Sequence, residues 1–146
     1  MVESPLQPGT AAAQATILVV DQLPYTRELL RDVLRPAGYR CLLAADGLEA
    51  MGVIRRERPD LVITGVKIPI ITGVDLLRYL RENDPNIASI ILTSETDPKV
   101  LVACYRLGAY NVIYKPVHID ALLIFVERAL EHRQLLIERR RWLTGP

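Results

Sequence analysis

The chain has 146 residues, of which half are hydrophobic and 24% are charged. This length and composition fit one globular domain with its own core and exclude a disordered chain. The 18 basic and 17 acidic residues leave a net charge of +1, which excludes a general attraction to nucleic acid or to an anionic membrane, so neither is an expected partner.

The first fifteen residues mix Pro, Gly, Ala and Gln without a basic start or an apolar core. They therefore predict a disordered tail over residues 1–15 rather than a secretion signal. The longest apolar runs are far shorter than the roughly 20 residues that cross a bilayer. Cys41 and Cys104 show no metal-type spacing, and two isolated cysteines without an export signal indicate buried, reduced thiols and a cytoplasmic location.

Five short apolar runs then alternate with five segments of helical spacing. The predicted strands are 16–20, 39–45, 61–64, 87–93 and 110–114. The predicted helices are 24–35, 48–58, 73–82, 97–107 and a last one that begins near His118. Strands and helices that alternate through short connections predict an α/β fold, with a five-stranded parallel sheet and helices on both faces in a doubly wound (βα)5 order.

Polar residues follow four of the predicted strands. They are Asp21 and Gln22 after the first, Gly65 after the third, Thr93 and Ser94 after the fourth, and Lys115 after the fifth. In a doubly wound sheet, ligands and chemistry gather beyond the carboxyl ends of the strands. We therefore expect these residues to converge and to hold a phosphate or to form a polar network.

The order of ILVVDQ, PDLVITGVKIP, IILTS and GAYNVIYKP resembles the receiver domain of bacterial two-component response regulators. The resemblance covers residues 16–130 and implies the flavodoxin-like version of the fold. It also implies transfer of a phosphoryl group from a kinase histidine to an aspartate at the end of the third strand. That chemistry needs a carboxylate nucleophile, Mg²⁺ held by acids after the first strand, a hydroxyl and a lysine.

Two positions depart from the family pattern. Asp21, Thr93 and Lys115 match the first acid, the hydroxyl and the lysine, whereas Gln22 stands in place of the second acid and Gly65 in place of the nucleophile. Glycine has no oxygen to attack phosphorus, and an amide has no charge to hold a hard cation. The resemblance therefore implies a degenerate receiver that has lost the Mg²⁺ site, needs no cofactor and is not an enzyme. Without a carboxylate at position 65, Lys115 is expected to pair with Asp21.

The family usually carries an aromatic switch residue three positions before the lysine, and here that position is Val112. Tyr110 and Tyr114 flank it, but strand alternation does not make either of them a replacement. The rotamer change by which this aromatic side chain signals in the family is therefore also expected to be missing.

The last helix continues without Pro or Gly as far as Gly145, about fifteen residues beyond the usual end of the fold. We treat residues 131–146 as a helical extension or linker. A possible coiled-coil seam consists of Leu122, Val126, Ala129, Leu136 and Leu143. The alternative is a solvated signalling linker to an output domain that follows residue 146.

These features predict a signalling module that acts through protein contacts without phosphorylation. The expected partners are a sensor kinase, a downstream output protein or a second copy paired through the last two helices. The candidate surface residues are Leu101, Cys104, Tyr105, Val126 and Leu130. Two other functions stay open, a phosphorylated switch with a non-standard acceptor and a small-ligand sensor that uses the space beside Gly65. A third possibility, an engineered Gly65 in an ordinary receiver, is opposed by the second loss at Gln22.

Overall fold

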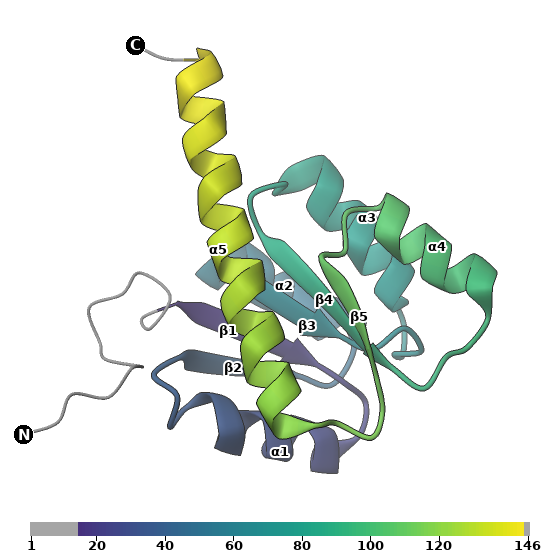
Figure 1. The fold of residues 1–146 in the computed structure, drawn as a ribbon. Helices are drawn as coiled ribbons and strands as arrows, with labels where there is room; N and C mark the ends of the chain where they lie inside the picture. The colour runs from purple at the N-terminus through teal and green to yellow at the C-terminus, as the bar shows by residue number, and fades with distance from the viewer. Residues whose placement is uncertain (1–14, 145–146) are drawn as a thin grey trace, which may run out of the picture.

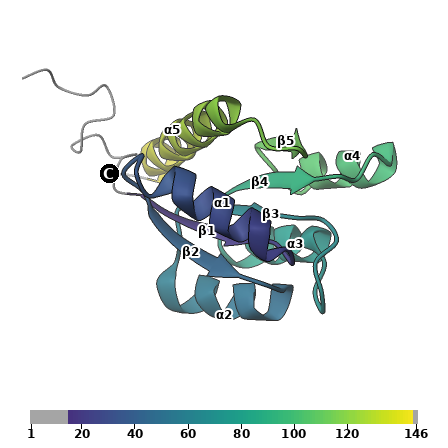
Figure 2. The same ribbon diagram turned by 90° about the horizontal axis from the view of Figure 1, so that it is seen from below.

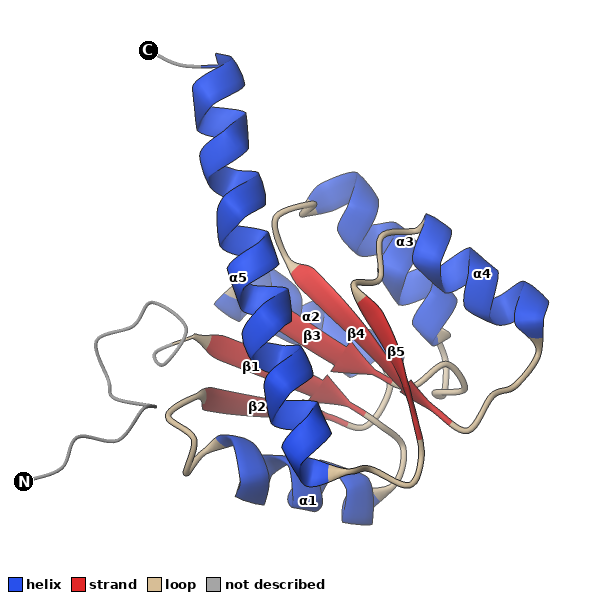
Figure 3. Cartoon of the chain, in the orientation of Figure 1, coloured by secondary structure: helices blue, strands red, loops and turns tan. Residues whose placement is uncertain are grey.

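The computed structural model describes residues 15–144, so the predicted tail lies outside the described residues except for Ala15. The strands are β1 (Thr16–Val20), β2 (Arg40–Ala44), β3 (Leu61–Thr64), β4 (Ala88–Thr93) and β5 (Asn111–Tyr114). The helices are α1 (Pro24–Leu34), α2 (Gly47–Glu57), α3 (Gly73–Asn83), α4 (Pro98–Arg106) and α5 (Ile119–Thr144). Each predicted element is confirmed, and the boundaries move by one residue in most cases (Figure 3).

All neighbouring strands are parallel, in the order β2-β1-β3-β4-β5. The prediction of a doubly wound five-stranded sheet is therefore confirmed (Figure 1). The chain leaves β1 toward one edge to make β2 and returns past β1 to make β3. This reversal separates the loops that follow β1 and β3, and crevices in sheets of this kind form at such a switch point.

Side chains alternate between the two faces of the sheet, as they must along any strand. On β1, Ile17 and Val19 pack in the core beneath α1 and α5, whereas Leu18 and Val20 pack with residues of α2 and α3. Figure 2 shows α1 and α5 on one side of the sheet and α2 and α3 on the other. A third cluster joins Cys104 of α4 to Leu77 of α3 and to β4 and β5. Because both faces are covered, the central strands consist mainly of apolar residues.

Polar caps begin the helices that follow the carboxyl edge of the sheet. Asp46, Thr72 and Asp97 precede α2, α3 and α4, and each side chain accepts a hydrogen bond from a backbone N–H of the first turn. Helix α1 instead has Pro24 in its first turn, where the missing N–H has no intrahelical partner to lose. These caps fix where each loop ends, and they thereby position the residues between strand and helix.

Helix α5 has 26 residues and extends past the edge of the sheet (Figure 1). Its residues Leu122, Val126 and Ala129 are completely buried in the core beneath the sheet. The predicted coiled-coil seam is therefore wrong over its first half, because the domain's own sheet already covers those side chains. None of the described helices combines the length and apolar character that crossing a membrane requires.

The predicted interaction surface also needs correction. Cys104, Val126 and Leu130 are buried in the core clusters, so they cannot meet a partner in this conformation. Leu101 is half-buried, and Tyr105 is 49% exposed. An interaction surface on α4 that includes these two residues therefore stays a prediction.

Polar contacts hold α5 where it passes the amino-terminal edge of the sheet. The Arg133 guanidinium lies 3.2 Å from the Asp60 carboxylate and donates a 2.8 Å hydrogen bond to the carbonyl of Asn86. Asp60 also accepts a hydrogen bond from the backbone N–H of Thr16. Two turns further on, Arg140 donates to the side-chain oxygen of Asn86. The helix is thus joined to the starts of β1 and β3 and to the loop before β4.

Candidate functional site

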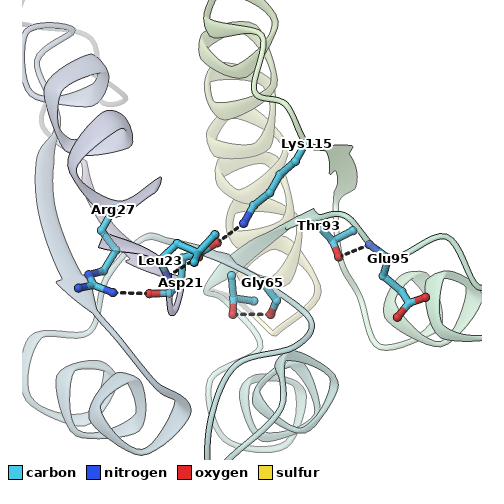
Figure 4. A network of polar contacts seen from close by, with 8 residues as sticks. Asp21, Leu23, Arg27, Gly65, Thr93, Glu95 and Lys115 are labelled. Atoms are coloured by element: carbon cyan, nitrogen blue, oxygen red, sulfur yellow. Dashed lines mark hydrogen bonds and ion pairs between the residues drawn. The ribbon is translucent and has the colours of Figure 1, made fainter. Parts of the chain in front are cut away.

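The carboxyl edge of the sheet contains a cavity of about 370 Å³. Its lining includes every residue predicted from the strand ends, namely Asp21, Gln22, Gly65, Thr93, Ser94 and Lys115. They come from four different loops and meet because parallel strands all end at the same edge. Figure 4 shows these loops converging on Asp21 and Gly65.

Asp21 and Lys115 form the main ion pair of the cavity. The Lys115 Nζ atom lies 2.8 Å from Asp21 Oδ2, and the predicted pair is confirmed (Figure 4). The second oxygen of Asp21 accepts a hydrogen bond from the backbone N–H of Leu23, and its carbonyl accepts one from Arg27. The Asp21 side chain is only 5% exposed and that of Lys115 is 22% exposed. Each charge therefore depends on the other for much of its compensation.

Gly65 lies directly beneath this pair. A Cβ atom built on it would lie 3.4 Å from a methyl group of Ile68 and 3.6 Å from Asp21 Oδ2. Both are ordinary contacts, so the backbone has room for a side chain at this position. The loop after Gly65 then returns to α3, where the N–H of Gly73 donates to the carbonyl of Val66. The surrounding packing therefore does not by itself require glycine at position 65.

The hydroxyl groups near Gly65 have hydrogen-bond partners in the protein. Thr64 Oγ1 is buried and donates a 2.9 Å hydrogen bond to the carbonyl of Gly65. Thr93 Oγ1 accepts a 2.9 Å hydrogen bond from the backbone N–H of Glu95. Neither hydroxyl contacts a base that could activate it as a nucleophile.

A second acid–base pair lines the cavity. Its two residues were not among those predicted from the strand ends. Lys67 lies 3.4 Å from the carboxylate of Glu95. The backbone N–H groups of Asp97 and Thr96 also donate to that carboxylate. The Asp97 hydrogen bond, together with Lys67, lowers the pKa of Glu95 below its ordinary value, against a smaller opposing effect of burial. The position of Glu95 two residues after Thr93 was the only sequence signal for this contact.

Val112 of β5 is buried beneath α4. Its backbone N–H lies 3.3 Å from the hydroxyl of Tyr105, which also donates to Asn111. Tyr114 is 52% exposed, and Tyr110 packs against the His132 ring at 5.2 Å. No aromatic side chain therefore stands where Val112 does, and Tyr105 attaches the last turn of α4 to β5 directly.

The residues of the cavity do not fit Mg²⁺. This ion prefers an octahedral set of oxygen ligands that usually includes one or two carboxylates. Asp21 Oδ2 is already paired with Lys115, Gln22 offers an uncharged amide and Gly65 offers no side chain. Among residues 15–144 no three His, Cys, Asp or Glu side chains cluster as metal ligands would. We therefore derive no step that passes through a metal.

The sequence of residues 17–127 matches the family described as the response regulator receiver domain. This match covers most of the chain and all five strands except Thr16, the first residue of β1. The chain belongs to the response regulator receiver family. It is accordingly a receiver module of two-component signalling, a class of signalling domain.

Similar curated proteins include the sporulation initiation phosphotransferase F of Bacillus subtilis. The two sequences are 36% identical over 114 residues, which is 78% of this receiver and 92% of that protein. The C4-dicarboxylate transport transcriptional regulatory protein DctD of Pseudomonas aeruginosa is 36% identical over 128 residues, which is 88% of this chain. The receiver spans only 28% of the length of DctD.

Solved structures support the same assignment. A response regulator receiver domain protein from Clostridium thermocellum superposes with a TM-score of 0.79 at 30% identity, and the match covers 84% of this receiver and 98% of that chain. NtrX from Brucella abortus, solved in complex with ADP, gives a TM-score of 0.83 at 29% identity. That match covers 88% of this receiver and 30% of the NtrX chain.

Proposed function

We propose that this receiver transmits signals through protein contacts and without phosphorylation of an aspartate. The observation that carries the proposal is Gly65 at the end of β3, beneath an Asp21–Lys115 pair that is already closed. Phosphoryl transfer needs a nucleophilic oxygen at that point, and the backbone of glycine supplies none. The lysine that would compensate the developing charge instead compensates Asp21.

The neighbouring groups do not replace the missing carboxylate. The Thr64 hydroxyl is buried and donates to a carbonyl. Asp75 lies in the first turn of α3, where it accepts from Thr72 and pairs with Arg78 on the surface. In this proposal the ion pair holds the domain in one state, and the partner recognises that state.

The proposed partners are a sensor kinase, a downstream output protein or a second copy of the chain. We propose a receiver unit over residues 16–130 followed by a helical extension or linker over residues 131–146, and a role in binding rather than in enzymatic catalysis. Cys41 and Cys104 are both buried and free, which supports the cytoplasm as the proposed location because that compartment keeps thiols reduced.

Mass spectrometry tests the proposal directly. The protein is incubated with a small phosphodonor and Mg²⁺, and its intact mass is measured. We expect no gain in mass, since no acceptor is present. Gly65→Asp combined with Gln22→Asp is the matched control, because it restores both missing acids and the Cβ at position 65 meets only ordinary contacts. The control is expected to gain one phosphoryl group.

A stable gain of one phosphoryl mass by the unaltered chain would overturn the proposal and favour a non-standard acceptor. A small-ligand sensor is the other candidate, and the cavity of about 370 Å³ beside Gly65 is the observation that favours it. Its signature is a rise in Tm with a small polar compound that disappears in Gly65→Asp, because the new side chain occupies the same space.

A further inference from the structure

The surface of α5 that faces away from the sheet carries a regular stripe of exposed side chains. We call it the outer stripe, and it consists of Ile124, Arg128, Glu131, Leu135, Glu138 and Trp142. Successive members are separated by four, three, four, three and four residues. The core-facing residues Leu122, Val126 and Ala129 lie on the opposite side of the helix. The outer stripe is therefore independent of the face that packs on the sheet.

Three large apolar side chains of the outer stripe remain in solvent. Ile124 is 49% exposed, Leu135 is 64% exposed and Trp142 is 88% exposed. Alternating spacings of four and three residues bring side chains to one seam, which is the pattern by which two helices pack along their length. The stripe thus has both the spacing and the uncovered apolar surface of a helix-pairing face.

The charges of the stripe decide the direction of pairing. In a parallel pair each residue meets its own copy, so Arg128 would face Arg128, Glu131 would face Glu131 and Glu138 would face Glu138. Like charges that face each other are unfavourable. In an antiparallel pair that aligns Ile124 with Trp142 of the second copy, Arg128 lies opposite Glu138 and Leu135 lies beside Glu131.

The flanking positions agree with the antiparallel alignment. Glu127 and Arg141 are both exposed and border the stripe on the same side. In the alignment that pairs Ile124 with Trp142, Glu127 of one copy lies close to Arg141 of the other, because the two-fold axis of an antiparallel pair brings the same border of each helix together. Each end of the seam then has an apolar contact and two opposite-charge pairs. Residues at the borders of such seams commonly set the orientation of the partner helix.

We infer that the outer stripe binds a second copy of this chain, with the two α5 helices antiparallel about a two-fold axis at residue 133. The overlap from residue 124 to residue 142 is about 28 Å long at a rise of 1.5 Å per residue. A contact made by one helix from each copy buries less surface than a standard-size interface. The dimer therefore forms in a concentration-dependent way. The inference rests on the proposed function in that it specifies one of the proposed partners, a second copy. It involves no chemistry at Gly65, so its failure would leave the proposal on phosphorylation untouched.

Sedimentation velocity of the whole chain, from low micromolar to near-millimolar concentration, measures the association. Arg128→Glu alone and Glu138→Arg alone are each expected to weaken the dimer about tenfold, because the two symmetry-related pairs both change from attraction to repulsion. The double variant exchanges the charges and is expected to recover the original affinity. Arg56→Glu, which changes an exposed charge on α2, is the matched control and should leave association unchanged.

Disulfide formation tests the direction of pairing. The double variant Ile124→Cys with Trp142→Cys is expected to form covalent dimers through residues 124 and 142 of different copies, whereas Trp142→Cys alone is expected to form no covalent dimer on oxidation. The native cysteines are buried and do not compete. A chain that stays monomeric at every concentration would overturn the inference. So would a 142–142 disulfide or a charge exchange that fails to restore association.

Discussion

Replacement of Lys115 by methionine tests whether the ion pair holds the cavity together. The change keeps most of the side-chain length and removes the charge that lies 2.8 Å from Asp21 Oδ2. The Asp21 carboxylate then keeps the N–H of Leu23 as a hydrogen-bond donor, but it loses its ion-pair partner in a place where its side chain is only 5% exposed. Removing one partner of a fully buried pair costs about 3 to 5 kcal/mol.

The partial exposure of Lys115 reduces this cost. Its side chain is 22% exposed, so water can reach the space that the ammonium group leaves. We therefore expect Lys115→Met to lower the free energy of unfolding by about 2 kcal/mol. Asp21→Asn should cost less, about 1 kcal/mol, because the amide oxygen still accepts from Leu23 and Lys115 can turn toward solvent. The double variant should then be less destabilised than the sum of the two single changes.

Urea denaturation followed by far-UV circular dichroism measures the four proteins of this double-mutant cycle. The single tryptophan, Trp142, is 88% exposed and does not report on folding of the core. Lys67→Met is the matched control, because Lys67 is 81% exposed and lies 3.4 Å from its partner. Its expected cost is about 0.5 kcal/mol or less. A coupling energy near zero between positions 21 and 115, or equal costs for the two lysine variants, would refute the reasoning.

Three further changes test other parts of the structure. Ile70→Gly should stabilise the protein by about 1 kcal/mol in urea denaturation, because Ile70 has φ 73° and a 72% exposed side chain that gains little from packing; a loss of stability would contradict this. Gly47→Ala should destabilise by more than about 3 kcal/mol because its Cβ would lie 2.2 Å from the carbonyl oxygen of Ile71, whereas Gly52→Ala, with no atom within 4 Å, should gain about 1 kcal/mol in the same helix. Burial raises the pKa of the Cys41 thiol to about 11 from 9.0, despite Arg35. The thiol therefore loses its proton at lower pH in the unfolded chain than in the folded one. Between pH 8 and pH 11 this difference should lower the free energy of unfolding by about 2 kcal/mol. Cys41→Ala lacks the thiol, so its free energy of unfolding should fall by about that much less than that of the wild type between the two pH values.

Much of the fold could be predicted because each element has a local signal. The strand β3 begins with three consecutive apolar residues, and α2 follows Asp46, whose side chain caps it in the structure. The Asp21–Lys115 pair could also be predicted, since both residues follow strands and a partly buried lysine needs an acid. These inferences depend on short stretches of sequence and on the rule that parallel strands end at one edge.

The face of α5 that packs on the sheet could not be predicted as reliably. The helix carries two overlapping repeats, one through Leu122, Val126 and Ala129 and one through Ile124, Leu135 and Trp142. Periodicity alone does not say which repeat meets the sheet. The structure assigns the first repeat to the core, where Leu, Val and Ala fill the space beneath β4 and β5.

Contacts between distant loops could not be predicted from the sequence either. The pair of Lys67 with Glu95 and the left-handed backbone of Ile70 both depend on how the loop after β3 folds over the cavity. The pair of Arg133 with Asp60 joins residues 73 positions apart in the chain. No local pattern marks such partners, because their proximity follows from the assembled sheet.

The contacts of Arg133 and Arg140 fix the last turns of α5 to the rest of the domain. These side chains attach the helix to Asp60 and Asn86, so its base moves as one body with the starts of β1 and β3. Beyond Arg140 the helix continues for only about 6 Å to Thr144, at 1.5 Å per residue. A tilt of this edge of the sheet would therefore be carried to the end of the helix with little loss, and Trp142 would move together with the domain.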